Sequence, residues 1–407
     1  MPETNSYQLL LNLLRLTPPG SLATPLPHLD NQQWQKLLEQ AQQQGVAALL
    51  LKRLKHSQPA PPDQVLTTLQ KASYRNAAHN LLLYHQLTSI LPKLAEQHIP
   101  VIALKGLHLS ELVYQDPSLR PMNDMDLLVP IEKLLDSYNL LQSMGYQAPD
   151  YINLQKEVHR HHHLPPLTKA GAAIVELHWN LTDPTSQKSV DLPGLWQRAQ
   201  PATLAGIPTL VLSPEDLLLH LALHFGNHNF RLGLRHLYDL LVSLEHYQEQ
   251  INWPSLLAHS QAWHADRCLF LTLYLAHDLL NAPLPGGVLE QLQPPSFTPN
   301  LAEQARQRLL NPLPANLHPD LIQLWSHQPT TRKLKAAWRA LFPPLDYMHT
   351  VYQTPTQPLR IYPYYLLRLV HLLRKYSPQF WQLLRRNPQL SAAAQKENSL
   401  TDWLSEM

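Results

Sequence analysis

The stretch that decides the fold is Leu104–Val129, LKGLHLSELVYQDPSLRPMNDMDLLV. Near its end, Asp124 and Asp126 lie two residues apart in an apolar run that predicts a strand over Asp124–Val129. Side chains two apart on a strand share a face, so Met125 points into the opposite layer. Two close carboxylates repel unless a cation lies between them, and Mg²⁺ takes one or two carboxylates together with phosphate oxygens. We interpret the pair as metal ligands, with a solvated surface pair as the alternative.

The residues before this pair suggest a phosphate site. Ile99–Leu104 predicts a short strand and Gly106–Gln115 a short helix, with Lys105 at the junction. Helix N-terminal amides bind phosphate, Gly106 lets the backbone approach closely, and Lys105 supplies a charge. Arg120, just before the carboxylates, can bind a phosphate with two hydrogen bonds. The alternatives are a solvated strand end for the lysine and an ordinary loop cation for the arginine.

A third carboxylate is expected on a neighbouring strand. Val158–Thr168 and Ala172–Trp179 predict a hairpin, and Glu176 lies inside the second, apolar strand. A glutamate there is costly unless it is paired or bound to a metal. His178 shares its face. The alternatives are an edge strand with this glutamate in water, and Asp183 in the following turn as the third ligand.

The first strand of that hairpin contains a histidine run, Arg160–His163. On a strand, His161 and His163 share one face and His162 takes the other. They can meet phosphates or an acceptor near the site, but a polar strand with alternating exposure is the interpretation we favour.

The sequence around the carboxylates predicts an α+β fold between two helical regions. Apolar residues recur at helical spacing through residues 1–94, whereas residues 95–212 contain the predicted strands. Residues 213–390 are helical again, beginning at a serine cap followed by proline, and residues 391–407 are a polar tail. We therefore expect a small mixed sheet with flanking helices, embedded between helical N- and C-terminal regions.

Histidines also recur every fourth residue on the first helix of the second helical region: His220, His224 and His228. The glutamate of an HExxH zinc motif is missing after His224, which argues against a dedicated zinc site. A helix lining the cleft, with His224 and Asp239 contacting nucleotide or acceptor, is one interpretation. A structural hydrogen-bonded network is the other.

Composition limits the classes of partner. Charged residues are 15% of the chain and the net charge is +2, so we expect no nucleic-acid partner. The chain has one cysteine, no basic segment before an apolar N-terminal run, and no apolar stretch of spanning length. We therefore expect a cytoplasmic protein without a membrane span.

Residues 359–388 mix basic and aromatic side chains, which suggests either peripheral contact with a membrane, RNA or partner, or a core-packing helix with a solvated basic face. We favour the second.

Taken together, the motifs form a recognisable series. They are Leu104-Lys105-Gly106, Arg120, Asp124-Met125-Asp126-Leu127-Leu128-Val129, Gly145-Tyr146, Glu176-Leu177-His178-Trp179, and the later His224, His228 and Asp239. Over roughly residues 95–245 the chain resembles the uncharacterised nucleotidyltransferase family of bacterial proteins, within the DNA polymerase β-like nucleotidyltransferase superfamily. It departs from the wider superfamily in having Lys-Gly where a Gly-Ser turn is usual, and in a longer gap before the carboxylates.

The resemblance implies a polymerase β-like fold and transfer of a nucleoside monophosphate from an NTP. Asp124, Asp126 and Glu176 are then expected to hold Mg²⁺ (or Mn²⁺). The triphosphate is expected at Lys105, the Gly106 amide and Arg120, with the nucleotide also near His178, His224 and Asp239. We expect the acceptor to be a hydroxyl of a small molecule, peptide or protein. Two other interpretations are a DxD glycosyltransferase using a sugar nucleotide, and a degenerate, non-catalytic binding module.

Overall fold

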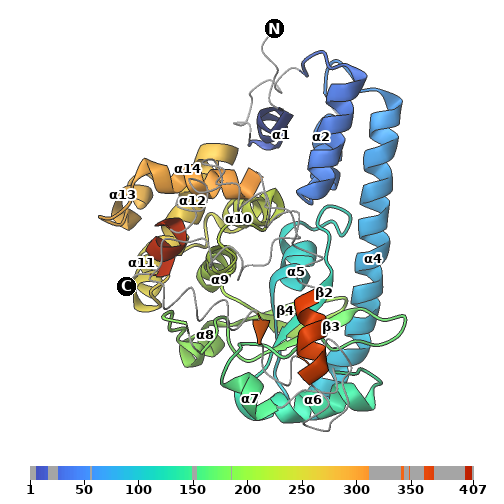
Figure 1. Ribbon diagram of the computed structural model, residues 1–407, viewed down its shortest axis with the longest axis vertical. Coiled ribbons are helices and arrows are strands. Elements are labelled where there is room, and N and C mark those ends of the chain that lie inside the picture. The colour runs from blue at the N-terminus through green and yellow to red at the C-terminus, as the bar shows by residue number, and fades with distance from the viewer. Residues whose placement is uncertain are drawn as a thin grey trace.

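The computed structural model describes residues 6–16, 26–55, 57–148, 154–184, 186–310, 341–342, 348, 362–370 and 399–405. It confirms an α+β protein in which helices surround a five-stranded mixed sheet (Figure 1). None of the helices within these ranges is long and apolar enough to cross a membrane. Most of the basic aromatic segment 359–388 and of the tail 391–407 lies outside the described residues.

The sheet brings together strands from both sides of the carboxylate motif. Its strands are β1 (Ile102–Ala103), β2 (Asp124–Leu128), β3 (Ile174–His178), β4 (Gln200–Leu204) and β5 (Ile207–Val211). Their order is β3-β2-β1-β5-β4, so β2 lies between β1 and β3. β2 runs antiparallel to β1 and parallel to β3. The β2–β3 register places Asp126 opposite Glu176, which is the arrangement that the functional site depends on.

One face of the sheet is an apolar layer. Met125, Leu127, Val175 and Leu177 are buried in a core cluster with residues of α4 (Asp63–Glu96) and α6 (Leu134–Ser143). Because side chains alternate along a strand, the carboxylates of β2 and β3 are left on the opposite face. Met125 therefore points into the other layer, as the sequence predicted.

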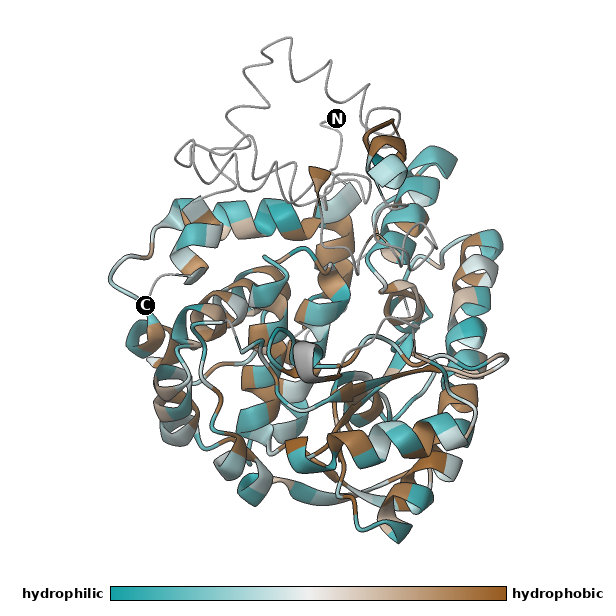
Figure 2. Ribbon diagram, turned by 60° about the horizontal axis from the view of Figure 1, so that its bottom comes forward, coloured by the Kyte–Doolittle hydropathy of each residue, from teal (hydrophilic) through white to brown (hydrophobic). Residues whose placement is uncertain are grey.

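The opposite side of the molecule is built by helices that precede and follow the sheet. Before it come α1 (Ser6–Leu14), α2 (Asn31–Gln43) and α3 (Ala47–Leu54). Helix α8 (Leu192–Arg198) lies between β3 and β4 in the chain. After the sheet come α9 (Pro214–Asn227), α10 (Leu234–Tyr247), α11 (Trp253–Ala262), α12 (Asp266–Leu280), α13 (Val288–Leu292) and α14 (Pro299–Leu310). Leucines of both groups share one hydrophobic cluster. In Figure 2 the strands are largely brown while the helices alternate brown and teal, as expected for helices that bury one side.

The segment between β1 and β2 is less regular than predicted. Instead of one helix over Gly106–Gln115, a four-residue helix α5 (Lys105–His108) passes into a π-helical turn, Leu109–Val113. A π turn widens the helix by one residue and often occurs at functional sites. After β2, a 3-10 turn, Ile131–Lys133, leads into α6.

The predicted hairpin over Val158–Thr168 and Ala172–Trp179 is only half correct. Its second strand is β3, but the first segment makes isolated bridges to β3, at His163–His178 and Leu167–Val175, and Val158 instead ends the short helix α7 (Leu154–Val158). Two prolines, Pro165 and Pro166, lie between the bridges, and proline has no N–H to donate to a ladder. The hairpin β4–β5, by contrast, has no counterpart among the strands expected from the sequence.

Candidate active site

Asp126 is the centre of a compact group of polar side chains on β2 and β3. It is buried, with 3% of its surface exposed, and its Oδ1 accepts hydrogen bonds from Lys105 Nζ at 2.9 Å and His178 Nε2 at 2.8 Å. Glu176 Oε2 lies 3.6 Å from the same His178 nitrogen. Asp126, Glu176 and His178 each offer one ligand atom, and these three atoms lie within 4.8 Å of one another. The three residues can therefore hold a single metal ion.

Asp124 lies on the same strand face, at the partly exposed start of β2. Burial, together with the negative charges of Asp126 and Glu176, raises the pKa of Asp124 to about 6, although Lys105 acts against the shift. Burial acts on the pKa of Asp126 in the same direction, but Lys105 and the hydrogen bond from His178 hold that pKa well below its usual value. The group therefore has more carboxylate charge than its own cations balance, which favours binding of a further cation.

Lys105 and Gly106 lie beside these acids. Lys105 has φ +40°, a backbone conformation that side-chain-bearing residues seldom adopt and that is often found at functional sites. At Gly106 an added Cβ would lie 2.9 Å from Arg120 Nη1 and 3.0 Å from Met122. Only glycine fits there, so the backbone and the Arg120 guanidinium stay in close contact.

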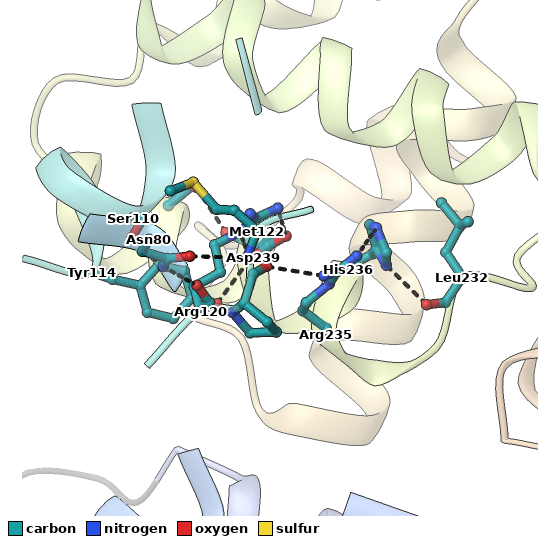
Figure 3. Close-up of polar contacts among 11 residues, drawn as sticks. Asn80, Ser110, Tyr114, Arg120, Met122, Leu232, Arg235, His236 and Asp239 are labelled. Carbon is teal, nitrogen blue, oxygen red and sulfur yellow. Dashed lines mark hydrogen bonds and ion pairs between the residues drawn. The ribbon is translucent and has the colours of Figure 1, made fainter. Parts of the chain in front are cut away.

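Arg120 is held from behind by Asp239, a residue of α10 (Figure 3). Its Nε and Nη2 donate to the two carboxylate oxygens of Asp239, both at 2.9 Å, and Tyr114 donates to the same carboxylate at 2.9 Å. Asp239 is fully buried. Its carboxylate bonds Arg120 and Tyr114 and does not line the pocket, so contact of Asp239 with nucleotide or acceptor stays a prediction. Its place in the structure is to fix the orientation of Arg120.

These groups open onto a pocket of about 300 Å³ between the sheet and the helices α9 and α10. Three acids, Asp124, Asp126 and Glu176, line this pocket. Most of its other polar lining residues are basic or imidazole side chains: Lys105, Arg120, His162, His163, His220, His224, His228, Arg235 and His236. A pocket lined by both acids and nitrogen donors suits a ligand that carries both a metal ion and phosphate groups.

His220 and His224 of α9, and His228 directly after its end, line this pocket, as in the first of the two interpretations of their spacing. Burial, followed by the charge of Lys105, lowers the pKa values of His220, His224 and His228. They are therefore neutral near pH 7. Within the described residues no zinc-like group includes them, because the cluster with metal-ligand spacing is Asp126, Glu176 and His178.

His178 differs from its predicted place at the nucleotide. It is 1% exposed and bonds Asp126, so it belongs to the carboxylate group rather than to the open pocket. The alternation expected for the histidine run is also wrong, since His162 and His163 both line the pocket while the side chain of His161 is half exposed. The run does not form a strand, so the two-residue periodicity does not apply. Asp183, the alternative third ligand, instead bonds His162 at 2.6 Å.

Several pocket residues were not singled out from the sequence. Arg235 donates from Nη1 to the Pro121 carbonyl at 3.0 Å, and His236 lies beside it (Figure 3). They occupy the first turn of α10, which begins after Gly233 at φ +83°. No spacing rule connects them to the carboxylates, so only the packing of α10 against the sheet segment reveals them.

Comparison with known proteins gives one family match. The sequence model of the family described as uncharacterised nucleotidyltransferase matches residues 30–281. The search of curated proteins finds no match. Among solved structures, the antibiotic-resistance factor ANT(2'')-Ia is 13% identical, with a TM-score of 0.32 over 50% of this chain and 98% of that chain. That similarity is too low to support an argument about this chain.

The family match covers more than half of the 407 residues and includes every strand and the helices α9 and α10. The chain therefore belongs to the uncharacterised nucleotidyltransferase family.

Proposed function

We propose that this protein is a metal-dependent nucleotidyltransferase that moves a nucleoside monophosphate from an NTP to a hydroxyl of a small molecule, peptide or protein. The observation that carries the proposal is the parallel register of β2 and β3. It sets Asp126 opposite Glu176, with Asp124 one step along the same face, in a pocket that many nitrogen donors also line.

Asp124, Asp126 and Glu176 would hold the divalent cation, with His178 beside them. When bound, such an ion polarises the phosphoryl group and offsets charge on the attacking and leaving oxygens. Glu176 has a lowered pKa despite partial burial, because the His178 imidazole lies beside it with Nε2 3.6 Å from Oε2, so it is an ionised carboxylate able to accept the proton of the acceptor hydroxyl. The acceptor oxygen then bonds to the α-phosphorus while the bond to the bridging oxygen breaks and pyrophosphate leaves.

The remaining pocket residues would bind the triphosphate. Lys105 already contacts the acids, and the Nη1 edge of Arg120 faces Gly106 rather than Asp239. Arg235, His224 and His228 line the adjacent wall. Fixed donors of this kind stabilise the negative charge that grows on the leaving group without reorganising during the reaction. Because the net charge of the chain is only +2, we favour a non-nucleic-acid acceptor.

The proposal is tested by ligand-induced stabilisation, since a ligand that binds only the native state raises the melting temperature with its concentration. Each NTP with Mg²⁺ or Mn²⁺ is titrated into the wild type, Asp124→Asn/Asp126→Asn, and the control Asp136→Asn, whose side chain is half exposed on α6. At least one NTP should stabilise the wild type and the control but not the double variant. If no NTP stabilises the wild type, or if all three proteins respond equally, the proposal is wrong. Release of pyrophosphate on turnover separates this reaction from sugar transfer.

A further inference from the structure

The metal-binding group contains an imidazole, which a site made only of carboxylates would lack. His178 Nε2 lies 2.8 Å from Asp126 Oδ1 and 3.6 Å from Glu176 Oε2. Three ligand atoms of mixed chemistry, two oxygens and one nitrogen, thus converge on one point. The nitrogen comes from a side chain that is 1% exposed and held on a strand, so it has little freedom to turn away.

The buried imidazole has one nitrogen in use and one without a partner. Nε2 faces the two carboxylates, whereas Nδ1 is buried and makes no hydrogen bond to any described residue. A neutral imidazole carries its proton on either nitrogen. If Nε2 binds a cation, the proton moves to Nδ1, where it meets no acceptor among the described residues. Ligation by the ring therefore costs the bond to Asp126 and the burial of an unpaired N–H, and binding of the cation has to offset both.

The present contacts of Asp126 are those that a cation would replace. Its Oδ1 accepts from both Lys105 Nζ and His178 Nε2. His178 Nε2 lies close to both carboxylates and the Lys105 ammonium lies beside Asp126, so both donors offset the repulsion of Asp126 and Glu176. A divalent ion at this point offsets the same repulsion more strongly, and releases Lys105 toward the pocket that it already lines.

Metal ions differ in how well they accept such a donor set. Mg²⁺ prefers oxygen ligands in near-ideal octahedral geometry and retains its waters. Imidazole nitrogen favours first-row transition metals, for which affinity rises from Mn²⁺ through Co²⁺ toward Zn²⁺. A buried nitrogen beside two carboxylate oxygens therefore discriminates against Mg²⁺.

We propose that the cation of this site is a first-row transition-metal ion bound through His178 Nε2 together with Asp126 and Glu176, and that the site selects such ions over Mg²⁺. The inference deepens the proposed function and rests on it only in requiring that the site holds a cation. Of the two ions expected from the sequence, Mg²⁺ and Mn²⁺, it favours Mn²⁺ or another first-row transition-metal ion.

The test uses the full chain, freed of metal by a chelator, with Mn²⁺ as the spectroscopic probe and no nucleotide. Electron spin echo modulation of bound Mn²⁺ reports a directly coordinated ¹⁴N nucleus. We expect this modulation in the wild type, together with a dissociation constant for Mn²⁺ about tenfold or more below that for Mg²⁺ by calorimetry. His178→Gln should lose the nitrogen signal and most of this preference, because glutamine can still donate to Asp126 but offers no imidazole. His228→Gln, at a pocket histidine outside the metal group, should keep both.

The wild-type spectrum alone decides the question even if His178→Gln fails to fold. Bound Mn²⁺ without ¹⁴N modulation means oxygen ligands only, which overturns the inference and leaves the nucleotidyltransferase proposal standing. A nitrogen signal that persists in folded His178→Gln also overturns it, because another histidine then supplies the ligand. If neither Mn²⁺ nor Mg²⁺ binds the wild type, with or without NTP, the metal centre itself is absent and the proposed function fails as well.

Discussion

At the scale of single residues, the site is organised by how its charges are balanced. Asp126 is buried with two donors on one oxygen, whereas Asp124, two residues earlier, is partly exposed and has no such pair of donors. Burial and the neighbouring carboxylates therefore act on Asp124 without full compensation, and its pKa rises to about 6. The two aspartates of this short motif therefore have opposite pKa shifts. Asp124 is the one whose charged form an added cation would stabilise most.

This shift predicts a pH dependence for the metal-free protein. A carboxyl whose pKa is higher in the folded than in the unfolded chain adds stability at low pH, where both states are protonated, and that stability is lost as pH rises through the folded pKa of about 6. In a chelator, the free energy of unfolding of wild type minus that of Asp124→Asn should fall between about pH 4 and about pH 7. Urea titrations across this range measure the difference. A difference that is flat or rises with pH would contradict the shift, and Asp136→Asn serves as the exposed control.

A second residue-scale prediction concerns the support of Arg120. Asp239→Asn removes the charge of a fully buried carboxylate and leaves the Arg120 guanidinium buried without its counterion. Breaking a buried pair in this way is expected to lower the free energy of unfolding by about 3–5 kcal/mol, measured by chemical denaturation. The matched control is Asp278→Asn, which removes the partner of Arg306 at the surface and should cost less than about 1 kcal/mol. Equal effects of the two substitutions would mean that the Arg120 pair is not a buried support.

The residues of the site were predictable from the sequence to the extent that they follow local spacing. Asp124 and Asp126 follow from the two-residue period of a strand, and Glu176 follows from the cost of a carboxylate in an apolar run. The pairing of Arg120 with Asp239 joins residues 119 positions apart. No local pattern encodes such a contact, because it arises only when α10 packs against the segment before β2.

At the scale of elements, helices and strands were predicted correctly where apolar residues recur with a clear period. The predictions failed where a glycine or a proline interrupts the regular backbone. β2 and β3 begin and end close to their expected residues. Within residues 1–94, where apolar residues recur at helical spacing, α2 and α3 are separate helices because Gly45 adopts φ +69° between them. Glycine enters that region without strain, and a period of apolar residues alone does not reveal the break. The predicted strand before β3 failed for the related reason that two prolines interrupt its hydrogen bonding.

The element that carries the pocket histidines, α9, is placed by a close contact with α12. At Gly226 an added Cβ would lie 2.4 Å from Cys268 Sγ and 3.1 Å from its Cβ. Gly226→Ala must therefore push the two helices apart or move the buried Cys268 side chain. We expect a loss of about 1–3 kcal/mol in the free energy of unfolding, as for other overpacked cores.

A double-mutant cycle checks that this loss comes from the contact. Cys268→Ala removes the sulfur atom that the new methyl group meets, so Gly226→Ala/Cys268→Ala should be more stable than the sum of the two single effects. Gly286→Ala is the matched control, because an added Cβ meets nothing within 4 Å there. It should change stability by less than about 0.5 kcal/mol. Strict additivity at positions 226 and 268 would show that the helices do not meet through this pair.

At the scale of the whole molecule, the helical flanks are parts of one core. The predicted division into residues 1–94, 95–212, 213–390 and 391–407 follows changes in composition and remains a prediction. Buried leucines of α1 nevertheless share a cluster with α9, α10 and α12, and the backbone N–H of Leu16 donates to the Leu280 carbonyl at 3.0 Å. The sequence predicted helices on both sides of the sheet, but helical periodicity does not specify which helices pack together.

Because the core is shared, we expect a destabilising substitution in the N-terminal helix α1 to destabilise the distant pocket as well. Leu10→Ala, at a fully buried position of α1, should lower the free energy of unfolding by about 2–5 kcal/mol. If the flanks and the sheet unfold together, far-UV circular dichroism and loss of Mn²⁺ binding should shift to lower denaturant concentration by the same amount. Leu81→Ala is the control, because this leucine of α4 is 59% exposed and should change stability by less than about 0.5 kcal/mol. If the variant loses secondary structure early while metal binding persists to the wild-type midpoint, α1 belongs to a unit that unfolds separately from the site. Coincident transitions instead mean that the metal site is held in place by the entire helical shell.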